Sequence, residues 1–424
     1  MRQTEQRMPS TPPGLFAIWP GLAIIVLALA VAASPALRWA DQPAAGGGRA
    51  APIDGLRGFA ALGVFLHHAV ITHAWLVAGI WRLPPSRFYT MAGQAGVALF
   101  FMITGMLFWS RLIARDGRMG WAGFGIGRIC RIGPLYLAAA AAAIAIAAAR
   151  TGFALHQPAW QVFKELVKWS ALGAFGNGPD VNGDRNTSLI LAGVVWTLQC
   201  EWAFYASLLP LAVFTRDRRA AAMLPAAVLS LVLLHLASGA PTPATPYAID
   251  IALFSAGMLI ASAAPLVARL APRWLRSAGA LALLVAAFAF CDTAYAPAPI
   301  LLLAGAFLLI ASGADLFGLL SSRAAGRLGA ISYGVYLLQG LVLTTLFAAP
   351  GLRRFALGAP LQYWAVLALA AILLLLVATI AHVAIEQPGI GAGRRFAAWL
   401  AGLRAARRER PPSRASGTAI PPVS

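Results

Sequence analysis

Long apolar segments recur along the whole chain, and they constrain the fold more than any other feature. A membrane-spanning helix needs about 20 mostly apolar residues, and eleven apolar segments can be drawn between Pro, Gly or charged residues. They lie at 15–34, 53–74, 92–113, 133–149, 189–214, 221–238, 248–268, 278–292, 298–320, 329–349 and 361–384. Hydrophobic residues make up 60% of the chain and charged residues only 11%, against about 45–50% and about 25% in soluble domains. We therefore expect an all-α, polytopic transmembrane helix bundle.

The net charge of +19 does not indicate a nucleic-acid partner. The arginines cluster in short runs between apolar segments, which is the distribution that the positive-inside rule produces in membrane proteins. The three cysteines, Cys130, Cys200 and Cys291, are widely spaced and sit in or beside apolar runs. They form neither a disulfide framework nor a zinc pattern, so we expect no metal and predict buried thiols.

Lys and Arg residues predict the orientation in the membrane. Alternate connections form two sets, and the richer one holds 21 Lys and Arg residues against 10 in the other. The richer set comprises 35–52, 114–132, 215–220, 269–277, 321–328 and 385–424. We place it in the cytoplasm of a bacterial inner membrane, together with the C-terminus. Parity then puts the N-terminus outside, so 15–34 is interpreted as a retained extra helix; a segment that crosses only partly and a cleaved signal peptide are the alternatives.

The connection 150–188 is the longest on the outer side. Its middle part, 160–169, alternates apolar and polar residues at helical spacing and has a tryptophan at each end. This pattern is typical of an amphipathic helix that lies in the membrane interface.

Ionisable residues inside lipid are costly, so each is a functional hypothesis. Arg57 and His68 lie on one apolar segment, eleven residues apart, which is about 16 Å and about three turns of helix. They therefore share a face, with Arg57 at the cytoplasmic surface and His68 near the bilayer centre. An imidazole is suited to proton transfer there, and a structural histidine is the alternative.

Glu201 lies about midway along the segment 189–214, at a depth that should match that of His68. A charged carboxylate at this depth needs a partner. A pair between Glu201 and His68, direct or through water, is the simplest way to accommodate both. The alternative is a structural role in which Glu201 bonds to a neighbouring backbone.

Arg128 and Arg131 are three residues apart, hence on one helical face, where a helix enters from the cytoplasmic side. Paired guanidinium groups bind phosphate through bidentate hydrogen bonds. Positive-inside anchoring alone is the alternative explanation.

Six ordered motifs resemble the acyltransferase-3 family of bacterial membrane O-acyltransferases over roughly 50–390. They are Ile53-Asp54-Gly55-Leu56-Arg57-Gly58 with His68, Gly96-Val97-Ala98-Leu99-Phe100-Phe101-Met102-Ile103-Thr104-Gly105, Arg128-x-x-Arg131-Ile132-x-Pro134-x-Tyr136, Trp196-x-Leu198-x-x-Glu201-x-x-Phe204-Tyr205, Leu328-Gly329-x-Ile331-Ser332-Tyr333-x-x-Tyr336-Leu337 and Glu386-x-Pro388. The resemblance implies a ten-helix core, here with one extra N-terminal helix. Three residues depart from the family pattern: Ala98 replaces a frequent Asp, Thr104 a Ser, and Gln339 a frequent His.

The resemblance implies transfer of an acyl group, usually acetyl, from cytosolic acyl-CoA (acetyl-CoA) to a hydroxyl of a cell-surface or exported glycan or glycolipid. On this basis Arg57, Arg128 and Arg131 are expected to bind the phosphates of the donor. His68 is expected to act as general base or acyl carrier, and Glu201 to orient it. Supporting roles are expected for Asp54, Tyr136, Trp196, Tyr205, Ser332, Tyr333 and Gln339.

The expected organisation has three parts. Residues 1–50 hold the extra helix and a linker, 51–390 form the acyltransferase domain, and 391–424 form a basic, disordered cytoplasmic tail. The expected partners are acyl-CoA, a carbohydrate or glycolipid acceptor and the lipid bilayer; the sequence does not indicate an oligomeric state.

Two other classes of function fit part of the pattern. A transporter of polysaccharide intermediates or organic acids would use His68 and Glu201 as a proton relay, but the ordered cytoplasmic arginines favour the enzyme. A non-catalytic scaffold would keep the fold and tolerate loss of His68.

Overall fold

The chain is a bundle of helices with no β-strand in the part that the structure describes. This computed structural model describes residues 14–41, 51–240 and 245–408. The α-helices are α1 (Ile18–Ala33), α2 (Ala51–Ala78), α3 (Arg87–Ile113), α4 (Trp121–Arg150), α5 (Ala159–Ser170), α6 (Trp196–Leu211), α7 (Arg218–Ala237), α8 (Thr245–Leu270), α9 (Arg273–Phe290), α10 (Pro297–Ala311), α11 (Arg323–Ala330), α12 (Ser332–Ala348), α13 (Pro350–Ala356), α14 (Pro360–Ala381) and α15 (Gln387–Arg408). The expected all-α fold is confirmed.

Seven of the described helices are long and apolar enough to cross a membrane. The pair α11 and α12 forms an eighth candidate that is bent by 66°, and α1 and α10 are shorter apolar helices. A helix stands at each of the eleven predicted segments, so the chain is a multi-pass membrane protein. The segment 189–214 differs from the expectation: α6 begins only at Trp196, and the short 3-10 helix η2 (Thr187–Leu191) and a left-handed turn at Ala192 precede it.

Contacts between connections divide the bundle into two ends. At one end Arg323 and Arg327 pair with Asp41, and Gly117 packs against the carbonyl of Ala212. We call this the arginine-rich end; it gathers connections of the set that is richer in Lys and Arg. At the opposite end Arg87 pairs with Asp292, with Nε 2.7 Å from Oδ1. The predicted alternation of the connections between two ends is therefore present in the fold.

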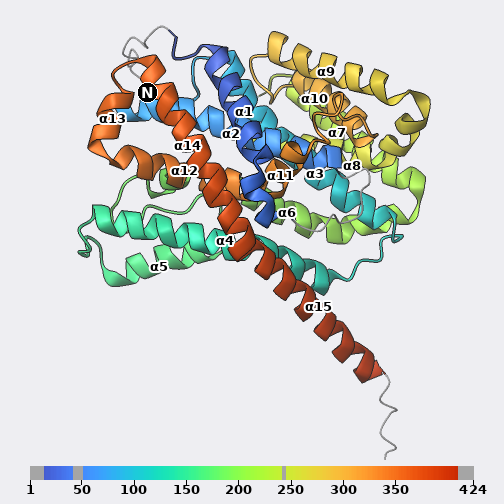
Figure 1. Ribbon diagram of the computed structural model, residues 1–424. Coiled ribbons are helices and arrows are strands. Elements are labelled where there is room, and N and C mark those ends of the chain that lie inside the picture. The colour runs from blue at the N-terminus through green and yellow to red at the C-terminus, as the bar shows by residue number, and fades with distance from the viewer. Residues whose placement is uncertain (1–13, 42–50, 241–244, 409–424) are drawn as a thin grey trace, which may run out of the picture.

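The extra N-terminal helix α1 runs from one end of the bundle to the other (Figure 1). Near its start, Tyr89 Oη donates to the carbonyl of Ala17 over 2.7 Å. After its end, Arg327 donates to the carbonyls of Ala32 and Ser34, each over 2.7 Å, and to Asp41. The helix packs on α11 and α14. Its two ends therefore contact opposite ends of the bundle, although with 16 residues it is one of the shorter apolar helices.

Small residues allow α2 and α11 to pack backbone to backbone. A Cβ at Gly329 of α11 would lie 2.0 Å from the carbonyl oxygen of Asp54 on α2. A Cβ at Gly58 of α2 would lie 2.6 Å from the Cβ of Leu328 on α11. Close packing at small residues is the usual way in which helices associate in lipid. The chain bends by 66° directly after α11, so Ser332 at the start of α12 lies beside the first turns of α2.

Helix α5 confirms the predicted helix at 160–169, and α4 and α5 lie side by side (Figure 1). Trp160, Phe163 and Val167 are exposed, whereas Trp169 is buried and donates from Nε1 to the carbonyl of Pro179. The exposed apolar residues leave a surface that suits a helix lying along a membrane.

The C-terminal tail is a correction to the expectation of disorder from residue 391. Helix α15 continues to Arg408 and projects from the bundle (Figure 1). Its start packs on α4, where a Cβ at Gly389 would lie 2.6 Å from the carbonyl oxygen of Cys130. The close contact at Gly389 thus holds the start of α15 against α4, and the helix continues into the predicted tail. The rest of that tail, 409–424, lies outside the described residues.

Candidate functional site: an arginine-lined cavity beside a buried histidine

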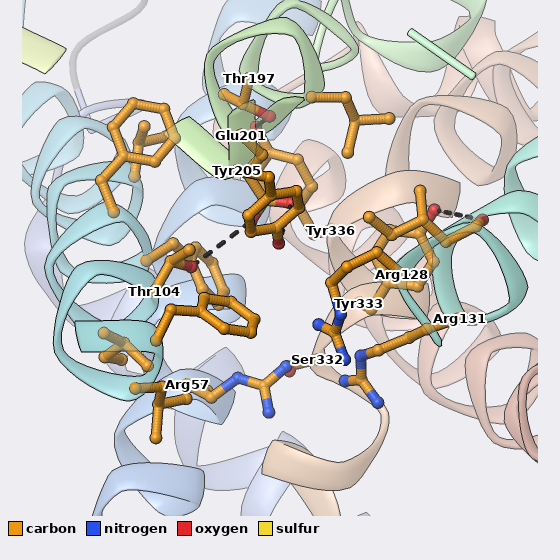
Figure 2. Close-up of a pocket in the computed structure, with 18 of the residues that line it drawn as sticks. Arg57, Thr104, Arg128, Arg131, Thr197, Glu201, Tyr205, Ser332, Tyr333 and Tyr336 are labelled. Carbon is orange, nitrogen blue, oxygen red and sulfur yellow. Dashed lines mark hydrogen bonds between the residues drawn. The ribbon is translucent and has the colours of Figure 1, made fainter. Parts of the chain in front are cut away.

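A cavity of about 360 Å³ opens among α2, α3, α4, α6 and α12, and we call it the arginine cavity. Arg57 of α2 and Arg128 and Arg131 of α4 line it, and Figure 2 shows their three guanidinium groups converging from both sides. The spacing of Arg128 and Arg131 places both on one face of α4, as the sequence indicated. The structure therefore brings together all three predicted phosphate-binding residues.

Arg111 of α3 also lines the arginine cavity. The guanidinium carbons of Arg111 and Arg128 lie 5.3 Å and 5.1 Å from the centroid of the Phe108 ring, a cation–π arrangement. Arg111 was not among the predicted site residues. Its position one turn after Phe108 on α3 was the available signal.

Positive charge exceeds negative charge around this cavity. Nη1 of Arg57 lies 3.6 Å from Oδ1 of Asp54. Among the described residues, no carboxylate lies within 4 Å of the guanidinium groups of Arg111, Arg128 or Arg131. Four converging guanidinium groups, three of them without a carboxylate within 4 Å in the described structure, suit an anion such as a phosphate.

Glu201 of α6 lies in the inner wall of the arginine cavity. Thr104 Oγ1 donates to its Oε1 over 3.4 Å, and Tyr205 Oη donates to its Oε2 over 3.2 Å; the bond from Thr104 is drawn in Figure 2. Of the two expected forms of the pair with His68, the direct one is wrong, because no hydrogen bond joins the two side chains in the described structure. Glu201 faces the arginines instead, and their positive charge offsets part of the cost of its burial.

His68 of α2 is held by α12. Its Nδ1 lies 3.4 Å from Oε1 of Gln339, and Nε2 of Gln339 donates to the carbonyl of Tyr336 over 2.8 Å. Because that second bond fixes the amide, Oε1 faces His68 and can only accept. Nδ1 of His68 therefore carries the proton, and Nε2 has the free lone pair. The ring stacks on Trp81 at a centroid distance of 5.9 Å.

Residues 51–383 match the acyltransferase-3 family, which is described as an acyltransferase domain. The chain belongs to this family. Comparison with curated proteins and with solved structures gives no match. The matched segment contains the arginine cavity, Glu201 and His68, and it makes the chain a membrane acyltransferase.

The other predicted site residues of this acyltransferase divide into two groups. Five of them line the arginine cavity or reach its wall, and the rest do not. The first group is Asp54, Tyr205, Ser332, Tyr333 and Glu201; the second is Tyr136, Trp196, His68 and Gln339. Tyr136 is buried in the core, and the backbone N–H of Trp196 donates to Asn177 Oδ1 over 3.1 Å. These two residues therefore support the structure around the site and do not contact its cavity.

Two polar residues that had no predicted role complete the inner wall. The hydroxyl groups of Thr197 and Tyr336 lie 3.0 Å apart, and both residues line the arginine cavity. Both lie within the family motifs. Among the described residues of the acyltransferase, no group of three or more His, Cys, Asp and Glu side chains is arranged to hold a metal ion.

A second cavity, of about 270 Å³, lies at the opposite end of the bundle. Helix α2 contributes Arg57 to the first cavity and Thr72 to the second, and α12 contributes Tyr336 to the first and Gly340 to the second. His68 lies between Arg57 and Thr72 on α2, and Gln339 lies directly before Gly340 on α12. The histidine of this acyltransferase thus lies on α2 between the residues that line the two cavities.

Proposed function

We propose that the protein transfers an acyl group, acetyl by preference, from cytosolic acyl-CoA to a hydroxyl of a cell-surface or exported glycan or glycolipid. The membrane is a bacterial inner membrane, and the arginine-rich end and the C-terminus face the cytoplasm. The excess of Lys and Arg in the connections of that end supports this orientation.

The single observation that carries the proposal is the convergence of Arg57, Arg128 and Arg131 on one cavity (Figure 2). Coenzyme A carries a diphosphate and a 3′-phosphate at one end and a thioester on a long, narrow arm at the other. The guanidinium groups suit the phosphates, and the inner part of the cavity, between Thr197 and Tyr336, suits the arm. The thioester then lies on the side of the cavity that is nearer to His68.

His68 acts as the general base. The free Nε2 takes the proton of the acceptor hydroxyl while the hydroxyl oxygen bonds to the thioester carbonyl carbon. The bond from that carbon to sulfur breaks, the thiolate of coenzyme A leaves, and the imidazolium returns the proton to it. Gln339 holds the tautomer that leaves Nε2 free, which is the role that the sequence analysis gave to Glu201.

Glu201 is a positioning residue in this scheme. Its carboxylate accepts hydrogen bonds from Thr104 and Tyr205 and lies beside the arginines. It thereby fixes the inner wall against which the arm of the donor packs.

The test is binding of radiolabelled acetyl-CoA to purified protein in nanodiscs. Wild type should bind saturably, and Arg57→Ala should weaken binding by about 10–100-fold, the effect of losing a charge-assisted hydrogen bond. His68→Ala should bind the donor normally and lose turnover by about 10²–10⁴-fold. Arg118→Ala is the matched control, because Arg118 is exposed at the same end and does not line the cavity.

Absence of saturable binding to any acyl-CoA would refute the donor assignment. A His68→Ala variant with full turnover would indicate a scaffold. The transporter alternative uses a relay between His68 and Glu201, and the hydrogen bonds of Glu201 to Thr104 and Tyr205 do not favour that pair. Movement of a glycan across proteoliposomes without any acyl donor would nevertheless support transport over transfer.

A further inference from the structure

The cavity at the opposite end of the bundle has the composition of a sugar site. Trp75 and Trp81 line it, with ring centroids 6.3 Å apart and ring planes at 81°. Neutral polar side chains, Thr72, Asn186 and Thr344, complete part of the wall. Binding sites combine apolar and aromatic surface with a few polar groups that fix orientation, and the face of a sugar ring is apolar while its edge is polar.

The same cavity carries positive charge. Arg150 and Arg353 line it, and no Asp or Glu is among its described lining residues. Arg150 has a distant partner outside the lining, with Nη1 3.6 Å from Oδ2 of Asp184. Arg353 donates from Nη2 to the carbonyl of Leu76 over 2.7 Å and has no carboxylate within 4 Å in the described structure. A guanidinium held by a carbonyl alone keeps its charge and further donors available to a bound anion.

The cavity also adjoins the proposed general base. Trp81 lines it and stacks on His68, with ring planes at 16°. Thr72, a further lining residue, lies one helical turn after His68 and donates to its carbonyl over 2.8 Å. Two residues that contact His68 therefore also line this cavity, which places the cavity next to the imidazole.

We propose that this cavity binds the acceptor, and that the acceptor is an acidic sugar whose carboxylate or phosphate pairs with Arg353 and Arg150. That the bound sugar is the acceptor rests on the proposed acyl transfer. That the cavity binds an acidic sugar rests on its lining residues alone. A neutral sugar would use the tryptophans but would leave the positive charge of Arg353 without a counter-ion.

The experiment measures binding of radiolabelled methyl β-glucuronide, methyl β-glucoside and glucose 1-phosphate to the full chain in nanodiscs of neutral phosphatidylcholine, without any acyl donor. The matched variants are Arg353→Ala and Arg354→Ala, because both arginines are exposed on α13 and only Arg353 lines the cavity. We expect at least one acidic ligand to bind about tenfold or more tightly than the glucoside. Arg353→Ala should raise the Kd of the acidic ligand by about tenfold and so abolish that preference. Arg354→Ala should leave the preference unchanged.

Equal binding of the acidic and neutral ligands, no saturable binding of an acidic ligand, or equal effects of the two substitutions would each overturn the proposal. Binding of acetyl-CoA is measured on the same preparations and reports on the arginine cavity. If acidic sugars bind through Arg353 while no acyl-CoA binds, the proposed function fails and the sugar site stands. If acyl-CoA binds and turns over while the charge preference is absent, the sugar site fails alone.

Discussion

His68 on α2 and Gln339 on α12 face each other across the helix interface, with Nδ1 of the histidine 3.4 Å from Oε1 of the glutamine. The glutamine is also bonded to the carbonyl of Tyr336, so the contact sets which ring nitrogen of His68 is free. One residue that departs from the frequent family pattern therefore takes the place of the expected carboxylate partner.

Replacement of Gln339 by Leu should lower the turnover of acetyl-CoA and leave its binding unchanged. The leucine cannot accept a hydrogen bond from Nδ1, so the ring loses its fixed tautomer. Loss of the partner of a catalytic-triad histidine lowers kcat by about 10⁴-fold. We expect turnover to fall by at least about tenfold here. Release of free coenzyme A in membranes of expressing cells measures turnover. Gln339→His, which supplies a ring nitrogen that can accept, should restore much of the activity. Weakened donor binding in Gln339→Leu would contradict this role.

Replacement of Arg111 by Ala should raise the KM for acetyl-CoA by about tenfold, with little change in kcat. The guanidinium lines the arginine cavity and shares the Phe108 ring with Arg128, and a lost charge-assisted contact to phosphate has about that effect. Arg115→Ala serves as control, since Arg115 is exposed one turn further on and does not line the cavity. Equal effects of the two substitutions would show general electrostatic attraction and no defined site.

Replacement of Thr104 by Val should reduce acetyl-CoA turnover several-fold, whereas Thr104→Ser should keep it. Valine has the shape of threonine but cannot donate to Glu201, so the buried carboxylate loses one of its two hydrogen bonds at a cost of about 1–3 kcal/mol. Serine keeps the donor and matches the residue frequent in the family. Turnover measurements on the three proteins at saturating donor test this, and an unaffected valine variant would remove Thr104 from the site.

Replacement of Gly329 by Ala should destabilise the folded protein by about 1–3 kcal/mol, the usual cost of overpacking. The new Cβ would lie 2.0 Å from the carbonyl oxygen of Asp54, so α2 and α11 would have to separate. Gly326→Ala on the same helix is the control, because nothing lies within 4 Å of its Cβ position. Thermal unfolding of the detergent-solubilised proteins compares them. Equal midpoints for the two variants would mean that this contact does not limit packing.

The contact of Asp41 with α11 should make the docking of α1 depend on acidity. The guanidinium groups of Arg327 and Arg323 hold the pKa of the Asp41 carboxyl well below its usual range. A lowered pKa means that the stabilisation is fully present above the unfolded-state value, about 3.9, and is lost as the pH falls further. Asp41→Asn should therefore lower the unfolding midpoint between pH 5 and 8, and the difference from wild type should shrink below about pH 4.

Asp116→Asn provides the comparison for this substitution, because Asp116 is exposed at the same end of the bundle and has no salt bridge in the described structure. Between pH 5 and 8 its unfolding midpoint should lie well above that of Asp41→Asn. A difference between Asp41→Asn and wild type that grows as the pH falls would contradict the sign of the effect.

Apolar length and residue spacing determined most of the fold and much of the site in advance. Each of the eleven apolar segments is helical, and 329–349 is divided between α11 and α12, because the lipid requirement for about 20 apolar residues leaves a direct trace in sequence. The spacing of Arg128 and Arg131 placed both on one side of α4, because local helix geometry is fixed by the backbone. The family motifs marked Arg57, His68 and Glu201.

Only the tertiary structure decided which of these residues meet. Equal depth in the membrane suggested a pair of His68 with Glu201, but depth fixes one coordinate, and the rotation of α2, α6 and α12 about their axes fixes the others. That rotation depends on close contacts at small residues such as Gly329 and Gly340, which join segments far apart in sequence. It turns Glu201 toward the arginines and His68 toward Gln339, and it leaves a cavity toward each end of the bundle.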